Sequence, residues 1–347
     1  MSKKLMLVLT IIILIFTTCV SSSPNHRNQP DWVLDPYSRL NRNEYIAVVG
    51  SGNSRQDAER NALNSLVAQF GQSIQVDERV STIYQETVRN TIVNWSEVTT
   101  AETVIALSTG INTLVGAEIG EFWKNSTGTY YTIAILNRAR AGGTYTDMVR
   151  ANLAMIDKLV NISTVDRNTL NSFARFQIAA TIADLTVIYG NLLQQVGFPY
   201  PGIRNGDTYR LEAASIRQNI PIRISVKKEA YADRGGRIEA AFARAFSDLG
   251  FLSGGTGSRY VLEVEINLTV VPHLNNSTFN SRIEMNANLI DVTTQMVLLP
   301  YFFAIRVGHT ASQENADNQA IEATVRNINN NYVRLLNDFL LGMIPRG

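Results

Sequence analysis

The sequence predicts an α+β fold in two domains, each mixing a small, mostly antiparallel sheet with packed helices. Segments whose apolar residues alternate, as in strands, are interspersed with segments whose apolar residues recur every three or four positions, as in helices. A stretch rich in glycine and proline, residues 197–206, separates two such series. A typical domain has about 100–200 residues. The 347 residues of the chain therefore divide into one domain at residues 31–196 and another at residues 207–347.

The first thirty residues differ from both domains. A basic start at Lys3 and Lys4 is followed by an apolar run from Leu5 to Phe16. The run is too short for a membrane-spanning helix, which needs about 20 apolar residues, and a small-residue site follows it. This layout is typical of a signal peptide and places it at residues 1–18. Residues 19–30 are polar and rich in serine, asparagine and proline, so they are predicted to form a flexible tether.

Cys19 is the only cysteine of the chain and therefore has no disulfide partner within it. The sequence Phe16-Thr17-Thr18-Cys19 resembles a bacterial lipobox, in which Leu usually stands in place of Phe16 and a smaller residue in place of Thr18. The resemblance implies that Cys19 is lipidated and anchors the mature chain to a membrane. Val20 is not the usual Asp retention signal, which favours the outer membrane by analogy. An ordinary signal peptide with an incidental Cys19 is the alternative.

The first domain opens with a strand, a turn and a helix. Residues 44–49 are predicted to form a strand, and residues 50–53 a tight turn after it. A helix then begins at Ser54, with Asp57 three residues later as in a capping box, and continues to Phe70.

In the middle of the first domain, the sequence leaves the type of one element open. Residues 72–84 alternate and indicate a strand, whereas residues 86–108 fit either a strand or a helix. Residues 114–123 and 130–136 flank a glycine-containing turn and are predicted to form a hairpin. After Asn137 the period becomes helical, and a second helix is predicted from about Thr169 to Val196.

The second domain has a different order of elements. The predicted elements are a strand at 220–226, a helix at 237–249, strands at 260–271, 282–291 and 296–307, and a closing helix at 316–341. The order is therefore a strand, a helix, three antiparallel strands and a helix.

The opening of the first domain resembles the LPP20-type lipoprotein domain, which also forms the amino-terminal domain of the flagellar protein FlgT. The resemblance covers about residues 30–140 and depends on Pro30-Asp31-Trp32, on the segment Tyr45–Gly52, and on the helix that carries Ala58 and Ala62. It implies a role in envelope assembly or scaffolding, and it implies no catalytic residues.

The second domain resembles the small α/β module of the TolB amino-terminal domain, CsgG and the lipoprotein activators of penicillin-binding proteins. The supporting residues lie in the segments 241–251, 260–266 and 289–294. This resemblance also implies an envelope protein without a catalytic constellation.

Charge and motifs argue against several other classes of function. The chain has 31 basic and 30 acidic residues and a net charge of +1, so no bulk attraction to nucleic acid is indicated. No HxH, HExxH or CxxC spacing is present, and no metal or cofactor is predicted. A site combining His273, His309 and Asp291 is the alternative that stays open. The segment Gly50-Ser51-Gly52 is interpreted as a tight turn and not as a phosphate-binding loop.

Four residues are candidates for an interaction surface. Trp32 and Trp123 are aromatic, and Trp123 stands beside Phe122, so that alternation turns one of the two rings outward. Asn327 and Asn331 belong to the weakly charged, asparagine-rich side of the closing helix, which is either solvated or packed on another subunit.

These observations together predict a non-catalytic envelope lipoprotein, a scaffold or assembly factor that faces the periplasm. Its expected partners are a membrane, through the lipid anchor, and envelope or flagellar proteins, and a homo-oligomer is left open. One alternative is a regulator of peptidoglycan synthesis. The other is a cell-wall hydrolase or carbohydrate-active enzyme, which would need two carboxylates across a cleft.

Overall fold

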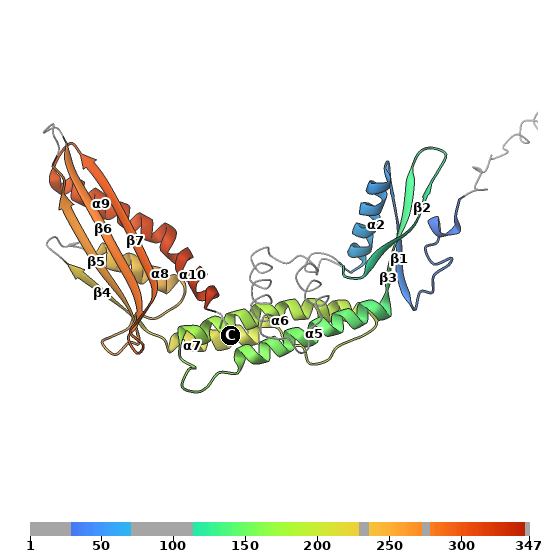
Figure 1. Cartoon of the computed structure of the whole chain (residues 1–347), viewed down its shortest axis with the longest axis horizontal. Coiled ribbons are helices and arrows are strands. Elements are labelled where there is room, and N and C mark those ends of the chain that lie inside the picture. Colours follow the sequence, from blue (N-terminus) through green and yellow to red (C-terminus); the bar gives the residue numbers. More distant parts are fainter. Residues whose placement is uncertain (1–28, 71–113, 229–235, 273–277, 344–347) are drawn as a thin grey trace, which may run out of the picture. The chain divides into compact units, whose positions relative to one another are not determined.

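A computed structural model of the chain shows two compact units, each containing strands and helices, which confirms the α+β fold class (Figure 1). The described residues are 29–70, 114–228, 236–272 and 278–343. Unit 1 comprises residues 1–71 and 116–140, and unit 2 comprises residues 72–115 and 141–347. The predicted domain boundary at residues 197–206 lies inside unit 2.

Several predicted segments lie outside the described residues. They are the signal peptide at 1–18, Cys19 with most of the tether, the strand at 72–84, the ambiguous segment at 86–108, and His273. These predictions stay as the sequence analysis states them.

Unit 1 is a three-stranded antiparallel sheet with one helix packed on it (Figure 1). Its elements are the short 3-10 helix η1 (Asp31–Val33), β1 (Tyr45–Gly52), α2 (Arg55–Gln69), β2 (Ala117–Lys124) and β3 (Tyr130–Asn137), and the strand order is β1-β3-β2. The predicted hairpin of β2 and β3 is confirmed. Its turn is closed by the Asn125 side chain, which accepts hydrogen bonds from the backbone N–H groups of Thr127 at 3.0 Å and Thr129 at 2.8 Å.

Strand β1 continues through Gly52, so the tight turn predicted at residues 50–53 is wrong in its position. The glycines serve close packing instead. A Cβ atom on Gly50 would lie 2.2 Å from the backbone nitrogen of Ala62 in α2, so only glycine lets the helix approach the strand this closely. The predicted helix start is confirmed, because the Ser54 side chain accepts a hydrogen bond from the Asp57 N–H at 3.1 Å.

Three helices form one part of unit 2: α5 (Arg138–Val160), α6 (Leu170–Val196) and α7 (Gly206–Gln218). The first three residues of α5 belong to unit 1. Helices α5 and α6 begin where the sequence predicts them to begin. The Thr169 hydroxyl caps α6 by accepting a hydrogen bond from the Ser172 N–H, and Gly197 ends it with a left-handed backbone at φ 94°.

Helix α7 is not predicted by the sequence, in which Asn205-Gly206 has the composition of a turn. The structure shows that Gly206 starts a helix packed on α6. The Gly206 N–H donates to the Asp184 carboxylate at 2.9 Å, and a Cβ atom on Gly206 would lie 2.4 Å from the same carboxylate. Tertiary contact with α6 therefore selects glycine at this position, and residues 197–206 join two packed helices.

The rest of unit 2 is a four-stranded sheet in the order β4-β5-β6-β7. Its strands are β4 (Ile222–Lys228), β5 (Tyr260–Val270), β6 (Phe279–Asp291) and β7 (Met296–His309). Strand β4 is parallel to β5, and the other neighbours are antiparallel. The predicted order of elements in this half of the chain is confirmed.

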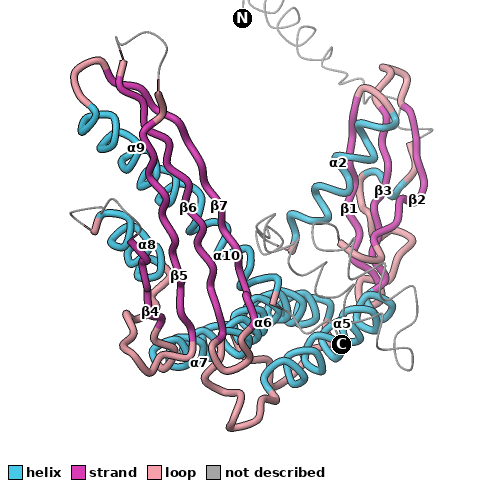
Figure 2. Tube along the Cα trace, turned by 60° about the vertical axis from the view of Figure 1, so that its left-hand side comes forward, coloured by secondary structure: helices cyan, strands magenta, loops and turns pink. Residues whose placement is uncertain are grey.

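Helices cover one face of this sheet, and Figure 2 shows α8 and α9 on that side. They are α8 (Arg237–Asp248) and α9 (Gln313–Asn327), and α10 (Val333–Gly342) packs on α6 and α8. The prediction of one continuous closing helix at 316–341 is wrong in detail, because a π-helical turn, Ile328–Tyr332, separates α9 from α10. Under the helices, the rings of Phe242 and Tyr332 meet edge to face with centroids 4.8 Å apart in the main core.

Candidate interaction surfaces

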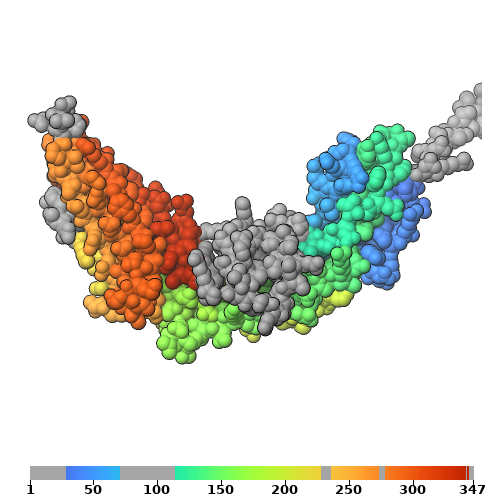
Figure 3. All heavy atoms as spheres, in the orientation of Figure 1, coloured from blue at the N-terminus to red at the C-terminus, as the bar shows by residue number. Residues whose placement is uncertain are grey.

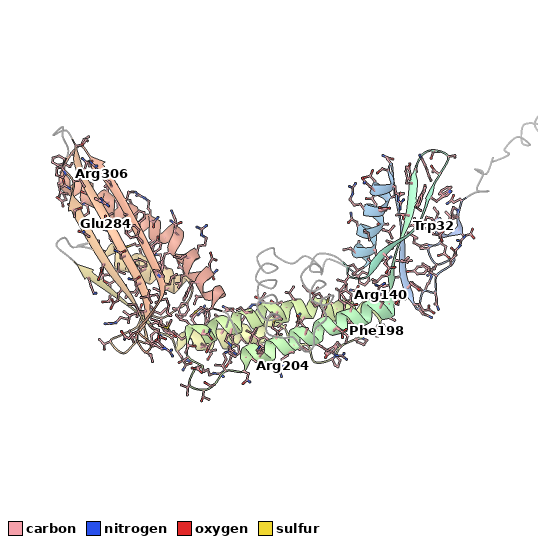
Figure 4. All side chains as sticks on the ribbon, in the orientation of Figure 1. Trp32, Arg140, Phe198, Arg204, Glu284 and Arg306 are labelled. Atoms are coloured by element: carbon pink, nitrogen blue, oxygen red, sulfur yellow. The ribbon has the colours of Figure 1, made fainter. Side chains whose placement is uncertain are left out.

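The two predicted tryptophans of unit 1 have different surroundings. Trp32 is only 2% exposed, and its indole N–H donates to the Glu121 carboxylate at 3.1 Å (Figure 4). Its ring therefore belongs to the small core of unit 1 and offers no free surface. Trp123 is partly buried, with its ring centroid 5.5 Å from that of Tyr131. Of the adjacent residues Phe122 and Trp123, Phe122 is the one whose ring faces outward, and it is 53% exposed.

On the asparagine-rich side of the closing helices, some side chains contact the rest of the fold and others face solvent. The Asn327 side chain accepts a hydrogen bond from the Tyr301 hydroxyl, so it connects α9 to strand β7. Asn331 lies half-buried in the π-helical turn, whereas Asn329 and Asn330 are exposed. Of the two predicted residues, Asn327 thus has a packing role that the sequence pattern does not reveal.

Among the residues that the structure describes, no group of three or more His, Cys, Asp or Glu side chains could hold a metal ion. His309 accepts a hydrogen bond through Nδ1 from the Ala311 N–H at 3.0 Å. Asp291 is engaged by Arg259, whose Nε and Nη2 atoms donate to its carboxylate at 2.7–3.1 Å. Asp291 thus already has a cationic partner, and His273, the third member of the alternative site, lies outside the described residues.

Asp291 is an anionic side chain held by hydrogen bonds at the end of β6. Its burial raises the pKa of the carboxyl, but hydrogen bonds from Arg259 and from the backbone N–H groups of Thr293 and Thr294 outweigh the burial, and the pKa lies below its usual value. The pair joins the start of β5 to the turn between β6 and β7.

Two buried carboxylates among the described residues of unit 2 bear on the hydrolase alternative. Besides Asp291, the other one is Asp317 in α9, which accepts a hydrogen bond from the Ser281 hydroxyl. Ser281 and Asp291 are ten residues apart on the same strand, which corresponds to about 33 Å at roughly 3.3 Å per residue. Asp291 and Asp317 are thus too far apart to act together on one glycosidic bond.

The open face of the four-stranded sheet is polar. It lies uncovered by described helices on the viewer's side of unit 2 in Figure 3, where the orange surface belongs mainly to β6 and β7. Arg282 and Arg306 stand opposite each other in the register of β6 and β7, and Glu284 forms an ion pair with Arg282. Figure 4 labels Glu284 and Arg306 on these two strands. Phe302, which is 63% exposed, is the exposed aromatic residue of this face.

The outer edge of β7 has no strand beside it among the described residues. This edge strand extends over 14 residues, and its only fully charged side chain is that of Arg306. It contains Pro300, which lacks a backbone N–H and is tolerated in a sheet where the nitrogen faces away from the neighbouring strand. Because backbone groups alternate in direction, we place the N–H and C=O groups of Phe302, Ala304 and Arg306 on the same free edge.

The opposite edge, formed by β4, is protected. Its first residue, Ile222, donates to the Leu252 carbonyl and accepts from the Gly254 N–H, both at 2.9 Å, so a connecting segment covers the start of the edge. Lys227, near the other end, is exposed and forms ion pairs with Glu263 and Glu265. A short, charged and partly covered edge is a common defence against added strands.

Helix α6 is long and apolar enough to cross a membrane by length and composition, and it is the one such helix in the part of the chain that the structure describes. In the structure, 61% of its most apolar window is buried. Apolar residues of α6, such as Leu170 and Phe173, pack in the core of unit 2.

No protein-family model matches the sequence, and no curated protein matches it. Among solved structures, the secreted protein HP1454 of the human pathogen Helicobacter pylori aligns with 82% of this chain and 97% of its own, at 12% identity and a TM-score of 0.38. A minor lipoprotein of Acinetobacter baumannii aligns with 35% of this chain and 91% of its own, at 12% identity and a TM-score of 0.25. Lipoprotein GNA1162 of Neisseria meningitidis aligns with 32% of this chain and 98% of its own, at 16% identity and a TM-score of 0.24.

These three neighbours are secreted proteins or lipoproteins of bacteria, the class that the sequence predicts. None of them identifies an LPP20-type or a TolB-type module. At TM-scores below 0.5 the likeness carries no further conclusion.

Proposed function

We propose that this chain is an envelope-attached, non-catalytic adaptor that binds a partner protein by accepting an extended segment of that partner along the free edge of β7. The observation that carries the proposal is the contrast between this long, apolar edge, beside which no described strand lies, and the protected edge at β4. Strand addition to an exposed sheet edge is a recurrent mode of recognition, in which backbone hydrogen bonds provide affinity.

The chemistry of the edge indicates the kind of segment that would fit. Ala304 leaves room beside the strand, Phe302 offers an exposed ring, and Arg306 supplies a fixed positive charge. An extended partner segment with apolar residues and a carboxylate opposite Arg306 complements these features. A second copy of the chain, paired antiparallel about Ile305, would bring the two Arg306 guanidinium groups to diagonal positions, where they repel each other.

The sequence supports three further parts of the proposal, which are the membrane anchor, the location and the class of partner. The lipobox-like segment ending at Cys19 supports attachment through acyl chains, and Val20 supports the outer membrane, with the folded part in the periplasm. The resemblance of residues 30–140 to the LPP20-type domain supports partners in flagellar or other envelope machinery. The resemblance of the second half to the TolB-type module supports the same class of partner.

The test is site-specific photo-crosslinking in the native cells. A photo-reactive residue replaces Ala304 on the β7 edge, and in a matched control it replaces Ser225 on the β4 edge. We expect one envelope protein to be crosslinked from Ala304 and not from Ser225, and we expect Cys19→Ser to reduce the yield by releasing the chain from the membrane.

Two outcomes would contradict the proposal. Equal crosslinking from both edges would mean that the β7 edge has no special role. Crosslinks only to a second copy of this chain would replace the adaptor with a homo-oligomer.

A further inference from the structure

A cavity with a volume of about 360 Å³ lies in unit 2, where α6, the ends of α7 and α8, and α10 come together. Ligand sites in proteins begin at about 300 Å³, so the cavity has room for a small molecule. Phe173 and Ala174 of α6, Leu249 at the end of α8 and Leu340 of α10 form its apolar wall. Phe173 and Leu340 also belong to the main core, so this wall is continuous with the core of unit 2.

Arg217, near the end of α7, brings a positive charge to the cavity. Its Nη1 atom donates a hydrogen bond to the Leu249 carbonyl, which ends α8, at 2.7 Å. A Cβ atom on Gly250 would lie 2.4 Å from the Arg217 Cζ atom, so the guanidinium group lies directly against the backbone of that glycine. Contacts with the end of α8 therefore fix the position of this charge.

The Arg217 guanidinium has no counter-charge in the part of the chain that the structure describes. No described residue forms an ion pair with it, and its Nε atom is buried without a hydrogen-bond partner. Burial of a charged group without an anionic partner costs free energy. An anionic group of a ligand in the cavity would offset this cost.

A negative charge in the same cavity disfavours a ligand that is only an anion. Asp248, the last residue of α8, lines the cavity and is exposed. No described residue, Arg217 included, forms an ion pair with Asp248. Two opposite charges that line one cavity without pairing are complementary to a ligand that carries both charges and bridges them.

Two side-chain amides add hydrogen-bonding groups from opposite helices. Gln177 of α6 and Asn337 of α10 line the cavity, and both are partly buried. Neither side chain has a hydrogen bond to another described residue. An amide can donate to a carboxylate and accept from an ammonium group. A few polar groups in a largely apolar cavity are typical of sites that orient a small ligand.

We propose that this cavity binds a free α-amino acid with an aliphatic side chain. The carboxylate of the amino acid pairs with Arg217, and its ammonium group pairs with Asp248. Its side chain lies against Phe173 and Leu340. A guanidinium group can bind a carboxylate through two parallel hydrogen bonds, which makes arginine suited to this role. The site is separate from the β7 edge and does not depend on the proposed adaptor function.

Calorimetric titration of the complete chain in detergent with L-leucine tests the site. We expect saturable binding that weakens at least tenfold in Arg217→Gln and in Asp248→Asn. The matched controls are Arg334→Gln in α10 and Glu239→Gln in α8. Each control removes one exposed charge that does not line the cavity, and both should bind leucine like the original chain.

Two analogues of leucine separate the roles of the two charged residues. The compound 4-methylpentanoate lacks the ammonium group, and 3-methylbutylamine lacks the carboxylate, so each should bind at least tenfold more weakly than leucine. Asp248→Asn should not weaken the binding of 4-methylpentanoate further, and Arg217→Gln should not weaken the binding of 3-methylbutylamine further. Because Asp248 is exposed, its variant tests the site even if the loss of the hydrogen bond from Arg217 to Leu249 impairs folding.

Three results would overturn the proposal. The first is that leucine does not bind to the original chain. The second is that the control variants weaken the binding of leucine as much as Asp248→Asn does. The third is that 4-methylpentanoate binds as tightly as leucine, which would mean that the cavity takes a simple carboxylate and that Asp248 has no role in it.

Discussion

The two edges of the four-stranded sheet in unit 2 differ in every property that controls strand addition. Strand β4 is half as long as β7, carries exposed charge at Lys227, and is covered at Ile222 by backbone hydrogen bonds from a connecting segment. Over Phe302–His309, no described strand lies beside β7, and Arg306 is its one fully charged residue. Edge protection among the described residues of this sheet is thus local to one side, and this difference is the reason for the docking site proposed at β7.

The largest effect on stability is expected from a substitution in the core that both edge strands share. Phe242 is fully buried beneath the sheet, 4.8 Å from the Tyr332 ring. Phe242→Ala should lower the free energy of unfolding by about 3–5 kcal/mol, and hydrogen exchange should show that β4 and β7 lose protection together. Loss of protection in one edge strand alone would mean that the two edges do not belong to one cooperative sheet.

A pair of proline variants tests which backbone groups of β7 are free. Ile305→Pro removes an N–H that we place toward β6 and should lower the free energy of unfolding by about 2–4 kcal/mol. Ala304→Pro imposes the same restriction on φ but removes an N–H that we place outward, so it should lower the free energy of unfolding clearly less. Urea unfolding of the two variants makes the comparison, and equal losses of stability would contradict the assignment of the free edge.

Acid should loosen the end of the sheet where β6 turns into β7. The pKa of Asp291 is lowered in the folded chain, so its contribution is present above its unfolded pKa of about 3.9 and is lost as the pH falls through the folded value. Asp291→Asn should lower the free energy of unfolding by about 1.5–3 kcal/mol at pH 7, the range for hydrogen bonds to a charged group. Unfolding measured from pH 7 down to pH 2 should show a smaller acid loss in Asp291→Asn than in the original chain; parallel curves would refute the role of this pair.

The smallest effect on stability is expected at the protected edge. Lys227 is fully exposed and its ion pairs with Glu263 and Glu265 are screened by water, so Lys227→Val should leave unfolding unchanged. The same variant should raise self-association in sedimentation measurements, because valine favours strand pairing and the charge is gone. Lys227→Gln is the control that removes the charge alone, and an unchanged sedimentation profile in Lys227→Val would mean that the charge does not protect this edge.

Elements with local signals are predictable from the sequence. The Ser54 cap, the hairpin around Asn125 and the cap of α6 at Thr169 each need only neighbouring residues, and all three are found in the structure. The sequence predicts turns at Gly50 and Gly206, whereas in the structure Gly50 lies close to α2 and Gly206 close to Asp184 of α6. Both are contacts between distant segments, which no local pattern encodes.

The candidate surfaces were less predictable than the fold. The burial of Trp32 depends on the sheet of unit 1, and the bond from Tyr301 to Asn327 depends on the packing of α9 against β7. Which strand ends a sheet is decided by its pairing with the others, so the open edge at β7 has no signature in the sequence of β7 alone.

The π-helical turn determines how the closing helices would respond to the deletion of a residue. Buried positions recur at every fourth residue through the closing helices: Ala316, Ala320, Thr324, Ile328, Tyr332, Leu336 and Leu340. Each step of four residues overshoots a turn of α-helix by about 40°, so six steps would carry the last side chain about 240° around a regular helix. The wide turn absorbs part of this drift. Deletion of a single residue between Ile328 and Tyr332 would rotate all that follows by about 100° and turn Leu336 and Leu340 toward water, so this segment tolerates a change of residue more readily than a change of length.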